Sequence, residues 1–529
     1  MPKKLREIPV IDLFAGPGGL GEGFSSLKRN KKPAFKIALS VEKDRHAHST
    51  LRLRSFMRKL DLATSSHLKR EFAQSKRKSA DVNDLYASFP DLIEEVDEEV
   101  LADRNDAQRE LGSRQFSNSD LDAIIRDRLA GAGVWALIGG PPCQAYSMVG
   151  RAKLKSLMGD SFEKDTRHFL YKQYLRIIGT HEPPIFVMEN VKGMLSSTIN
   201  GKRIVEQILE DLGRPHRSKD LSYRLYPFVQ PTDKSKRGLF GDDCDATDYI
   251  VRAEDFGVPQ KRHRVIILGI RSDIEVEPNQ IKASEDRVTL RDILGDLPPL
   301  RSQITKIDGV EIDWVHGVKS INAMLNNQDV PAPVAREIRE QLQHLNPDGE
   351  GYGSFKPYRR GKPTARVKSL YRQNDLGGVC NHEPRRHMLS DLHRYFYAAC
   401  YGQVEDCTGA YASPKLKDFP RVLLPDHENV DHDSVATAHF ADRFRVQLWD
   451  EPATTVTSHI SKDGHYFIHP DPSQCRSLSV REAARIQTFP DDYIFLGTRT
   501  AQYHQVGNAV PPLLAKQLAE VVYGVLARS

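Results

Sequence analysis

The sequence predicts an α/β fold built on a mostly parallel β-sheet, and two observations lead to this prediction. First, short apolar runs recur between segments of helical character, as in a doubly wound domain. Second, each run ends in polar or glycine residues, and ligands of such sheets bind beyond the carboxyl ends of the strands. The runs are IPVIDLF (8–14), FKIALSVE (35–42), VWALIGG (134–140), PPIFVMEN (183–190), DYIVRA (248–253) and RVIILGI (264–270).

The composition is that of a globular protein. The chain has 529 residues, enough for two or three domains, with 39% hydrophobic and 28% charged residues. No apolar run is long enough to span a bilayer, and the N-terminal segment lacks a signal-peptide pattern, so we expect a cytoplasmic protein without membrane contact. Six cysteines without a CxxC pair indicate neither a disulfide framework nor a zinc ribbon. The net charge of +5 permits an acidic partner without requiring one.

The first apolar run leads into a glycine-rich loop. Gly16, Gly18 and Gly21 satisfy the pattern G-x-G-x-x-G, and Glu42 ends the second run where a carboxylate binds a ribose. Glycines let the backbone approach a ligand, and any cofactor that contains adenosine fits this arrangement. A nicotinamide dinucleotide and a tight turn without a ligand are the alternatives at this point.

Two later run ends carry reactive side chains. Cys143 follows two prolines in LIGGPPCQAYSMVGR (137–151), so its thiol is expected in a stiff, exposed loop, as a nucleophile requires. Glu189 and Asn190 leave a buried run in FVMENVKGM, and a carboxylate there is a candidate acid. The alternatives are a small residue in a tight loop for the cysteine, and a helix cap or surface ion pair for the carboxylate.

A third stretch, GVPQKRHRVIILGI, places Gln260, Arg262 and Arg264 at spacing two on an extended segment. Side chains at this spacing point to one face of a strand, and converging arginines suit phosphate or carbonyl oxygens. An edge strand with a charged solvent face is the alternative interpretation.

Six blocks in a fixed order resemble the DNA cytosine C5 methyltransferase family. They are DLFAGPGG, GGPPCQAYS, ENVKG, QKRHR, RSLSVREAARIQTFPDDY (476–493) and QVGNAVPPLLAKQLAE (505–520). The resemblance implies a Rossmann-like fold that uses S-adenosyl-L-methionine, with a separate target-recognition domain. It also implies methylation of a flipped-out cytosine in double-stranded DNA to give 5-methylcytosine, in a restriction-modification or defence system.

The resemblance implies a role for each site residue. Cys143 would attack C6 of cytosine, Glu189 would bind N3 and the exocyclic amine, and Arg264 would hold O2. Arg262 and Gln260 would support the loop or contact nearby phosphates, and Asn190 belongs to the base-recognition segment. For the cofactor, Phe14 would stack on adenine, Gly16 and Gly18 would admit the amino-acid end, Glu42 would bind the ribose, and Asn508 would complete the pocket.

The expected domains are a catalytic domain over 1–275 with a helical insertion at about 53–130, a target-recognition domain over 276–449, and a return to the catalytic domain over 450–529. The segment 356–372 holds seven Lys or Arg, no Asp or Glu, and two interleaved tyrosines, which suits contact with phosphates. Arg359, Arg360 and Arg366 are the predicted DNA contacts there. The insertion departs from the family pattern, and Asp81 is a possible counterpart of the acidic residue that contacts adenine.

Three other functions were weighed. A cytosine C5 methyltransferase acting on transfer RNA is the main alternative, and the long variable region favours DNA. A nicotinamide oxidoreductase explains the glycines but leaves the cysteine, the carboxylate and the arginines without a task. A module that only binds DNA is disfavoured because the catalytic blocks are intact.

No metal site is expected, since NHEPRRH (381–387) beside Cys380 lacks the paired spacing of zinc ligands. A monomer is expected, with a cognate restriction endonuclease or a defence complex as a candidate partner.

Overall fold

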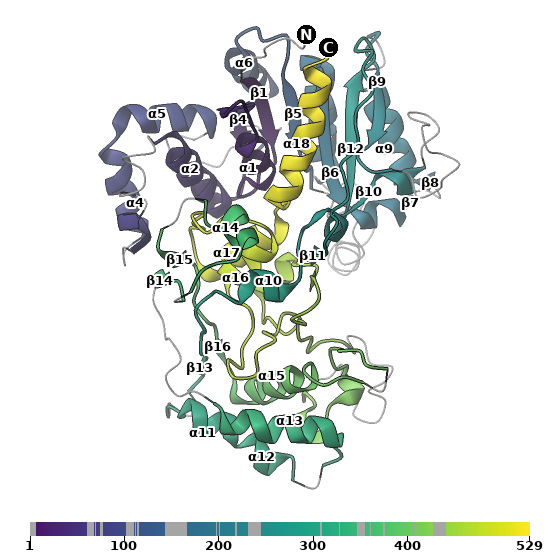
Figure 1. Ribbon diagram of the computed structural model, residues 1–529. Coiled ribbons are helices and arrows are strands. Elements are labelled where there is room, and N and C mark those ends of the chain that lie inside the picture. Colours follow the sequence, from purple (N-terminus) through teal and green to yellow (C-terminus); the bar gives the residue numbers. More distant parts are fainter. Residues whose placement is uncertain are drawn as a thin grey trace. The chain divides into compact units, whose positions relative to one another are not determined.

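A computed structural model describes residues 7–60, 68, 70–74, 78–101, 110–111, 113, 116–142, 167–196, 198–199, 202–216, 219–230, 245–306, 309–326, 328–345, 355–359, 361–373, 376–406, 408–426 and 441–529 (Figure 1). The chain divides into two compact units. The first unit comprises Met1–Leu60, Asp84–Asp286 and Ala509–Ser529, and the second comprises Asp61–Asn83 and Arg287–Asn508.

The first unit is built on a seven-stranded sheet, in the order β10-β12-β6-β5-β1-β4 with β9 also paired to β12. The strands are β1 (Ile8–Leu13), β4 (Phe35–Val41), β5 (Ala136–Gly139), β6 (Ile185–Val191), β9 (Tyr223–Pro227), β10 (Ile250–Arg252) and β12 (His263–Arg271). All six apolar runs predicted from the sequence are therefore strands of one sheet, and the predicted α/β fold is confirmed.

The sheet is mostly parallel, as predicted, and one strand is reversed. β4, β1, β5 and β6 are parallel neighbours, whereas β12 is antiparallel to β6, and β9 and β10 are antiparallel to β12. A parallel pair needs a crossover of a dozen or more residues. Residues 253–262, which join β10 to β12, are too few for one. β12 therefore runs against the other strands of the sheet, and β9 and β10 run with them.

Helices cover both faces of this sheet (Figure 1). One apolar core lies between the sheet and α6 (Asn118–Leu129), α8 (Arg167–His181) and α9 (Ile204–Gly213), and the other between the sheet and α1 (Gly19–Ser26) and α18 (Pro512–Leu526). The other elements of this unit are α2 (Arg45–Lys59), α5 (Pro90–Glu99), β2 (Lys28–Arg29), β3 (Lys32–Pro33), β7 (Thr198–Ile199), β8 (Lys202–Arg203) and β11 (Gln260–Lys261). α4 (Lys78–Ala87) includes residues of both units, and α4, α5 and α6 lie within the segment of about 53–130 that was expected to be a helical insertion.

The helix α18 is packed as a core helix. By length and composition alone the stretch Arg499–Leu526 is apolar enough to cross a membrane, but 67% of its apolar window is buried inside the structure. In the first unit, two glycines of α1 make this packing close. A Cβ at Gly19 would lie 2.2 Å from the carbonyl oxygen of Val510, and one at Gly23 would lie 2.3 Å from Cβ of Ala515. The backbones of α1 and of the segment that leads into and begins α18 are therefore in direct contact.

The second unit is mainly helical. Its core is formed by apolar side chains of α11, α13 and α15 together with segments near 416–424 and 444–475. Its elements are α10 (Leu290–Leu294), α11 (Trp314–Lys319), α12 (Ile321–Met324), α13 (Ala332–Gln343), α14 (Ala365–Leu370), α15 (Leu389–Tyr401), α16 (Val480–Ile486), α17 (Arg499–Asn508), β13 (Gln303–Ile304), β14 (Phe355–Pro357), β15 (Gly378–Cys380), β16 (Arg386–His387) and β17 (Ala453–Thr454). Residues 450–508, expected to return to the catalytic domain, belong to this unit, and only Ala509–Ser529 return to the first.

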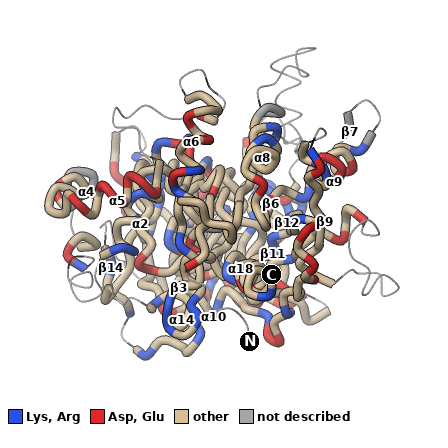
Figure 2. The backbone as a smooth tube through the Cα atoms, turned by 90° about the horizontal axis from the view of Figure 1, so that it is seen from above, with Lys and Arg blue, Asp and Glu red and all other residues tan. Residues whose placement is uncertain are grey.

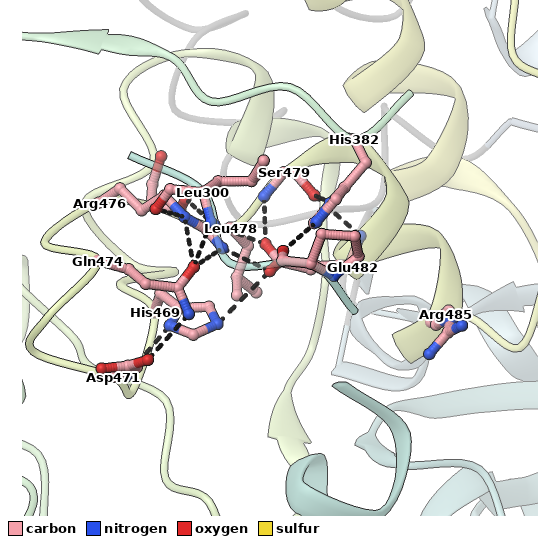
Figure 3. A network of polar contacts seen from close by, with 12 residues as sticks. Leu300, His382, His469, Asp471, Gln474, Arg476, Leu478, Ser479, Glu482 and Arg485 are labelled. Carbon is pink, nitrogen blue, oxygen red and sulfur yellow. Dashed lines mark hydrogen bonds and ion pairs between the residues drawn. The ribbon is translucent and has the colours of Figure 1, made fainter. Parts of the chain in front are cut away.

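The block 476–493 organises the interior of the second unit through buried charges (Figure 3). Arg476 makes two hydrogen bonds of 2.7 Å to the carboxylate of Glu482, which also accepts the backbone N–H of Ser479. His469 lies 3.4 Å from the same carboxylate. Burial lowers the pKa of His469 to about 4. Its Nδ1 accepts the N–H of Asp471, so the neutral ring carries its proton on Nε2, the nitrogen that faces Glu482.

Candidate active site

The glycine-rich loop begins where β1 ends, next to the edge strand β4 of the sheet of the first unit. Phe14, Gly16 and Gly18 all have positive φ, at 58°, 58° and 98°. Glycine adopts this conformation without strain, whereas for a phenylalanine it is unusual and typical of functional loops. A Cβ placed on Gly16 meets no atom within 4 Å, so the space beside it is open. The loop therefore offers its backbone to a ligand.

Glu42 closes this loop from the end of the neighbouring strand β4. One carboxylate oxygen accepts the N–H of Gly16 at 2.7 Å and the other accepts the N–H of Asp44 at 2.6 Å. Burial raises the pKa of Glu42, and these two hydrogen bonds oppose that rise. Four of the predicted cofactor residues, Phe14, Gly16, Gly18 and Glu42, are thus brought together at adjacent strand ends.

Asp12 lies under this loop, and the sequence reasoning assigned it no role. Its side chain is fully buried, and within the described residues neither carboxyl oxygen has a side-chain partner. A Cβ on Gly21 would lie 2.9 Å from its Oδ2. Burial, and after it the nearby Glu42, raise the pKa of Asp12 to about 8, while the backbone of Gly21 opposes the shift. An acidic residue inside an otherwise apolar strand was the signal that could have revealed it.

A second group of side chains gathers where β5 and β6 end. The amide of Asn190 donates to the carbonyl oxygen of Pro141 at 3.4 Å, and its Oδ1 accepts the N–H of Val191. A Cβ on Gly140 would lie 3.0 Å from Oε2 of Glu189. The loop that begins at Gly140 therefore starts directly beside the Glu189 carboxylate, and Asn190 fixes that start.

Arginines from β12 meet Glu189 on its other side. Nε of Arg264 lies 3.0 Å from Oε1 of Glu189, and both side chains are mostly buried. In the antiparallel pair β6–β12, Glu189 is opposite Ile266 and Arg264 is opposite Val191, so the two side chains meet across a diagonal. Burial lowers the pKa of Arg262 well below its usual value, Arg264 lowers it further, and Glu189 raises it.

Gln260 and Arg262 are fully buried, unlike Arg264, which keeps part of its surface exposed. Buried side chains cannot reach the backbone of a nucleic acid without rearrangement. Of the two roles implied by the resemblance, support of the loop is therefore the one that the burial favours. Glu189, Arg262 and Arg264 are the predicted catalytic residues that the structure brings together.

The other predicted residues lie elsewhere. Cys143 and Arg360 lie outside the described residues, and the described part of the nucleophile loop stops at Pro142, the residue before the cysteine. Arg359 and Arg366 belong to the second unit, as does Asn508, an exposed residue that ends α17 with its amide 3.2 Å from Nδ1 of His504. Their roles stay predictions. For Asp81, only its place in α4 is described.

Cys380 and His382, which a zinc site at this place would have used, have other partners. Cys380 donates to the carbonyl oxygen of Ala73, while His382 contacts Ser479 and the carbonyl oxygen of Pro298. Among the described residues, no group of three or more His, Cys, Asp or Glu is placed to hold a metal ion.

Taken together, the first unit is an α/β domain with an open glycine loop, a carboxylate at the next strand end, and a carboxylate–arginine pair beside a proline-rich loop. This combination defines a nucleotide-cofactor enzyme of the methyltransferase class rather than a passive binding module. Comparisons with known proteins agree. The profile of the family described as C-5 cytosine-specific DNA methylase matches residues 111–524.

Full-length relatives give the same result. The chain is 34% identical to Type II methyltransferase M.Bpa9945I of Bacillus paralicheniformis, over 98% of this chain and 99% of the relative. It is 26% identical to Type II methyltransferase M.DdeI of Desulfomicrobium norvegicum, over 97% and 87%, and 28% identical to DNA (cytosine-5-)-methyltransferase M.ApeKI of Aeropyrum pernix, over 75% and 83%. The chain belongs to the C-5 cytosine-specific DNA methylase family.

Proposed function

We propose that this protein transfers a methyl group to C5 of a cytosine in double-stranded DNA. The observation that carries the proposal is the contact between Glu189 and Arg264 at the start of the Gly140 loop. A carboxylate and a guanidinium held 3.0 Å apart present an acceptor and donors side by side. This pattern matches the N3, exocyclic amine and O2 edge of cytosine.

Each residue has a defined task in this reaction. The Cys143 thiolate forms a bond to C6, and the electrons of the C5–C6 double bond move to C5. Glu189 supplies a proton at N3, which balances the developing charge, and Arg264 holds O2. After C5 has gained its methyl group, its proton leaves to a base or water. The C5–C6 double bond then re-forms as the sulfur departs as a thiolate, and N3 returns its proton to Glu189.

The residues of the glycine loop fit S-adenosyl-L-methionine. Gly16 has open space beside it, and the Glu42 carboxylate lies at the strand end where a ribose would bind. Phe14 is only partly buried and can stack on an adenine. When bound, this cofactor supplies an electrophilic methyl group. The chain's own contribution is to orient it with Gly16, Gly18 and Glu42, with Asn508 proposed to complete the pocket.

The test is a covalent trap. The protein is incubated with S-adenosyl-L-methionine and duplex DNA in which 5-fluorocytosine replaces cytosine, and adducts are measured by mass. Fluorine cannot leave as a proton does, so the complex should stall with Cys143 attached to C6 and one methyl group added. The expected adduct is absent in Cys143→Ala and strongly reduced in Glu189→Gln.

Other outcomes would contradict the proposal. An adduct that survives Cys143→Ala would show a different nucleophile. An adduct on transfer RNA, with none on DNA of diverse sequence, would favour the RNA alternative. If neither nucleic acid gives an adduct or accepts radiolabelled methyl groups, the proposed reaction is wrong.

We propose that the protein acts in the cytoplasm, as the methyltransferase of a restriction-modification system. The names of the relatives M.Bpa9945I and M.DdeI are those of type II methyltransferases, and this supports a modification role. A cognate endonuclease that cuts the unmethylated form of the same site is the proposed functional partner, and a monomer is the proposed state.

A further inference from the structure

A polar cavity of about 560 Å³ lies in the second unit between α10 and α14. Its wall includes part of the basic segment 356–372, and four of its lining residues are cationic: Arg291, Arg359, Lys362 and Arg372. Figure 2 marks the Lys and Arg positions of α10 and α14 in blue. No step of the proposed reaction uses a residue of this cavity.

Two of the four cations already have partners. Arg291 donates to both oxygens of Asp450, at 2.7 and 2.9 Å, and stacks over Trp449. Arg372 pairs with Asp296 and lies 3.4 Å from the ring centre of Tyr358. These two arginines hold the walls of the cavity together.

The other two cations are uncompensated. Across the described residues, neither Arg359 nor Lys362 has an ion-pair or hydrogen-bond partner, and both are exposed. The cavity's own carboxylates have other partners: Asp292 accepts the N–H and hydroxyl of Thr289 and lies 3.6 Å from a guanidinium nitrogen of Arg366. Asp296 binds Arg485 as well as Arg372. Within the described part of the chain, the cavity therefore carries two positive charges, those of Arg359 and Lys362, that no carboxylate neutralises.

We propose that this cavity binds a phosphate of the DNA backbone through Arg359 and Lys362. The inference rests on the proposed function, because DNA supplies the phosphate. Two cations beside an open polar cavity neutralise a phosphate and release its counterions. Such a contact fixes the position of the duplex without reading its sequence. The basic segment thus contains Arg372, which is paired in the cavity wall, Lys356, which is buried and does not line the cavity, and the two proposed phosphate-binding residues.

The experiment compares DNA affinity at several salt concentrations for the wild type and for Arg359→Gln/Lys362→Gln. The probe is a fluorescent 30-base-pair duplex of mixed sequence, followed by anisotropy. Losing one phosphate contact lowers the slope of log K against log salt by about 0.9, which corresponds to about eightfold weaker binding at 0.1 M salt. The same loss is expected on duplexes of unrelated sequence. Thermal unfolding should be unchanged, since both side chains are exposed.

Lys368→Gln is the matched control. Lys368 lies in the same basic segment, is exposed and does not line the cavity. If this variant weakens binding and lowers the slope as much as the double variant, the effect is diffuse charge and the cavity has no special role. A loss confined to one DNA sequence would indicate base reading instead, which also overturns the inference.

The same measurements separate this inference from the proposed function. If the wild type methylates DNA but the double variant keeps its affinity and slope, only the phosphate site is wrong. If the wild type binds DNA through these residues but transfers no methyl group, only the reaction is wrong. A wild type that neither binds nor methylates DNA overturns both.

Discussion

Replacing Asp12 by asparagine tests whether the buried carboxyl under the glycine loop is protonated. The pKa of this group is raised from 3.8 to about 8, first by burial and then by Glu42. Between these values the folded chain holds a proton that the unfolded chain has lost. The free energy of unfolding must therefore fall as the pH rises from about 4 to about 8. An asparagine side chain in the same place would keep the shape but cannot ionise.

The magnitude follows from the pKa. One pKa unit is worth about 1.36 kcal/mol, so the three pH units from 5 to 8 correspond to about 4 kcal/mol. The constant cost of placing an amide in the same site cancels, because only the change with pH is compared. We expect the free energy of unfolding of Asp12→Asn, relative to that of the wild type, to rise by about 4 kcal/mol between pH 5 and pH 8.

The assay is urea unfolding followed by the fluorescence of Trp135, which is buried in the first unit. Trp314 and Trp449, both of the second unit, are replaced by phenylalanine in every variant so that the signal reports the first unit alone. If the wild type and Asp12→Asn keep a constant difference within about 0.5 kcal/mol over this pH range, the carboxyl does not titrate as argued.

Three further predictions concern both units. Arg264→Met should lower the rate of methyl transfer about 100-fold, as for the loss of one positioned donor to a developing charge, measured with radiolabelled cofactor. Glu482→Gln should destabilise the second unit by about 3–5 kcal/mol in thermal unfolding, because the charge of Arg476 is left buried without its partner. His469 is neutral when folded, with its pKa lowered from 6.5 to about 4. Stability is therefore full above pH 6.5 and falls by up to about 3 kcal/mol as the pH drops to 4, and His469→Gln should remove that loss in urea unfolding.

Each of these predictions has an outcome that contradicts it. Wild-type turnover by Arg264→Met would remove that residue from the reaction. A Glu482→Gln protein that unfolds at the wild-type temperature would mean that the buried pair contributes little. Equal loss of stability in acid for His469→Gln and the wild type would assign the acid sensitivity to other groups.

The sequence predicted the strands of the first unit well because apolar runs with polar ends report strands directly. It also placed Phe14, Gly16, Gly18 and Glu42 at one site, since the ends of neighbouring parallel strands meet. The antiparallel return of β12 was missed because strand direction depends on the length of the connection, which no periodicity reveals. The contact of Glu189 with Arg264 depends on the register between β6 and the antiparallel strand β12.

Burial of charged residues was the main feature that the sequence did not reveal. The block RSLSVREAARIQTFPDDY has an ordinary helical charge pattern, yet Arg476, Arg481 and Arg485 are all fully buried. Some of their partners lie in the same block, such as Glu482 for Arg476, and others come from distant parts of the chain, such as Asp296 for Arg485. In the segment 356–372, likewise, the side chains of Lys356 and Arg372 are buried.

The close packing of α18 on α1 has a consequence for synthesis of the protein. The glycine loop leads directly into α1, whose Gly19 and Gly23 contact residues beyond position 508. A ribosome has therefore made almost the whole chain before the helix that supports the cofactor loop finds its partner. A chain released before α18 is complete should be unable to hold the cofactor, so prematurely ended copies cannot modify DNA.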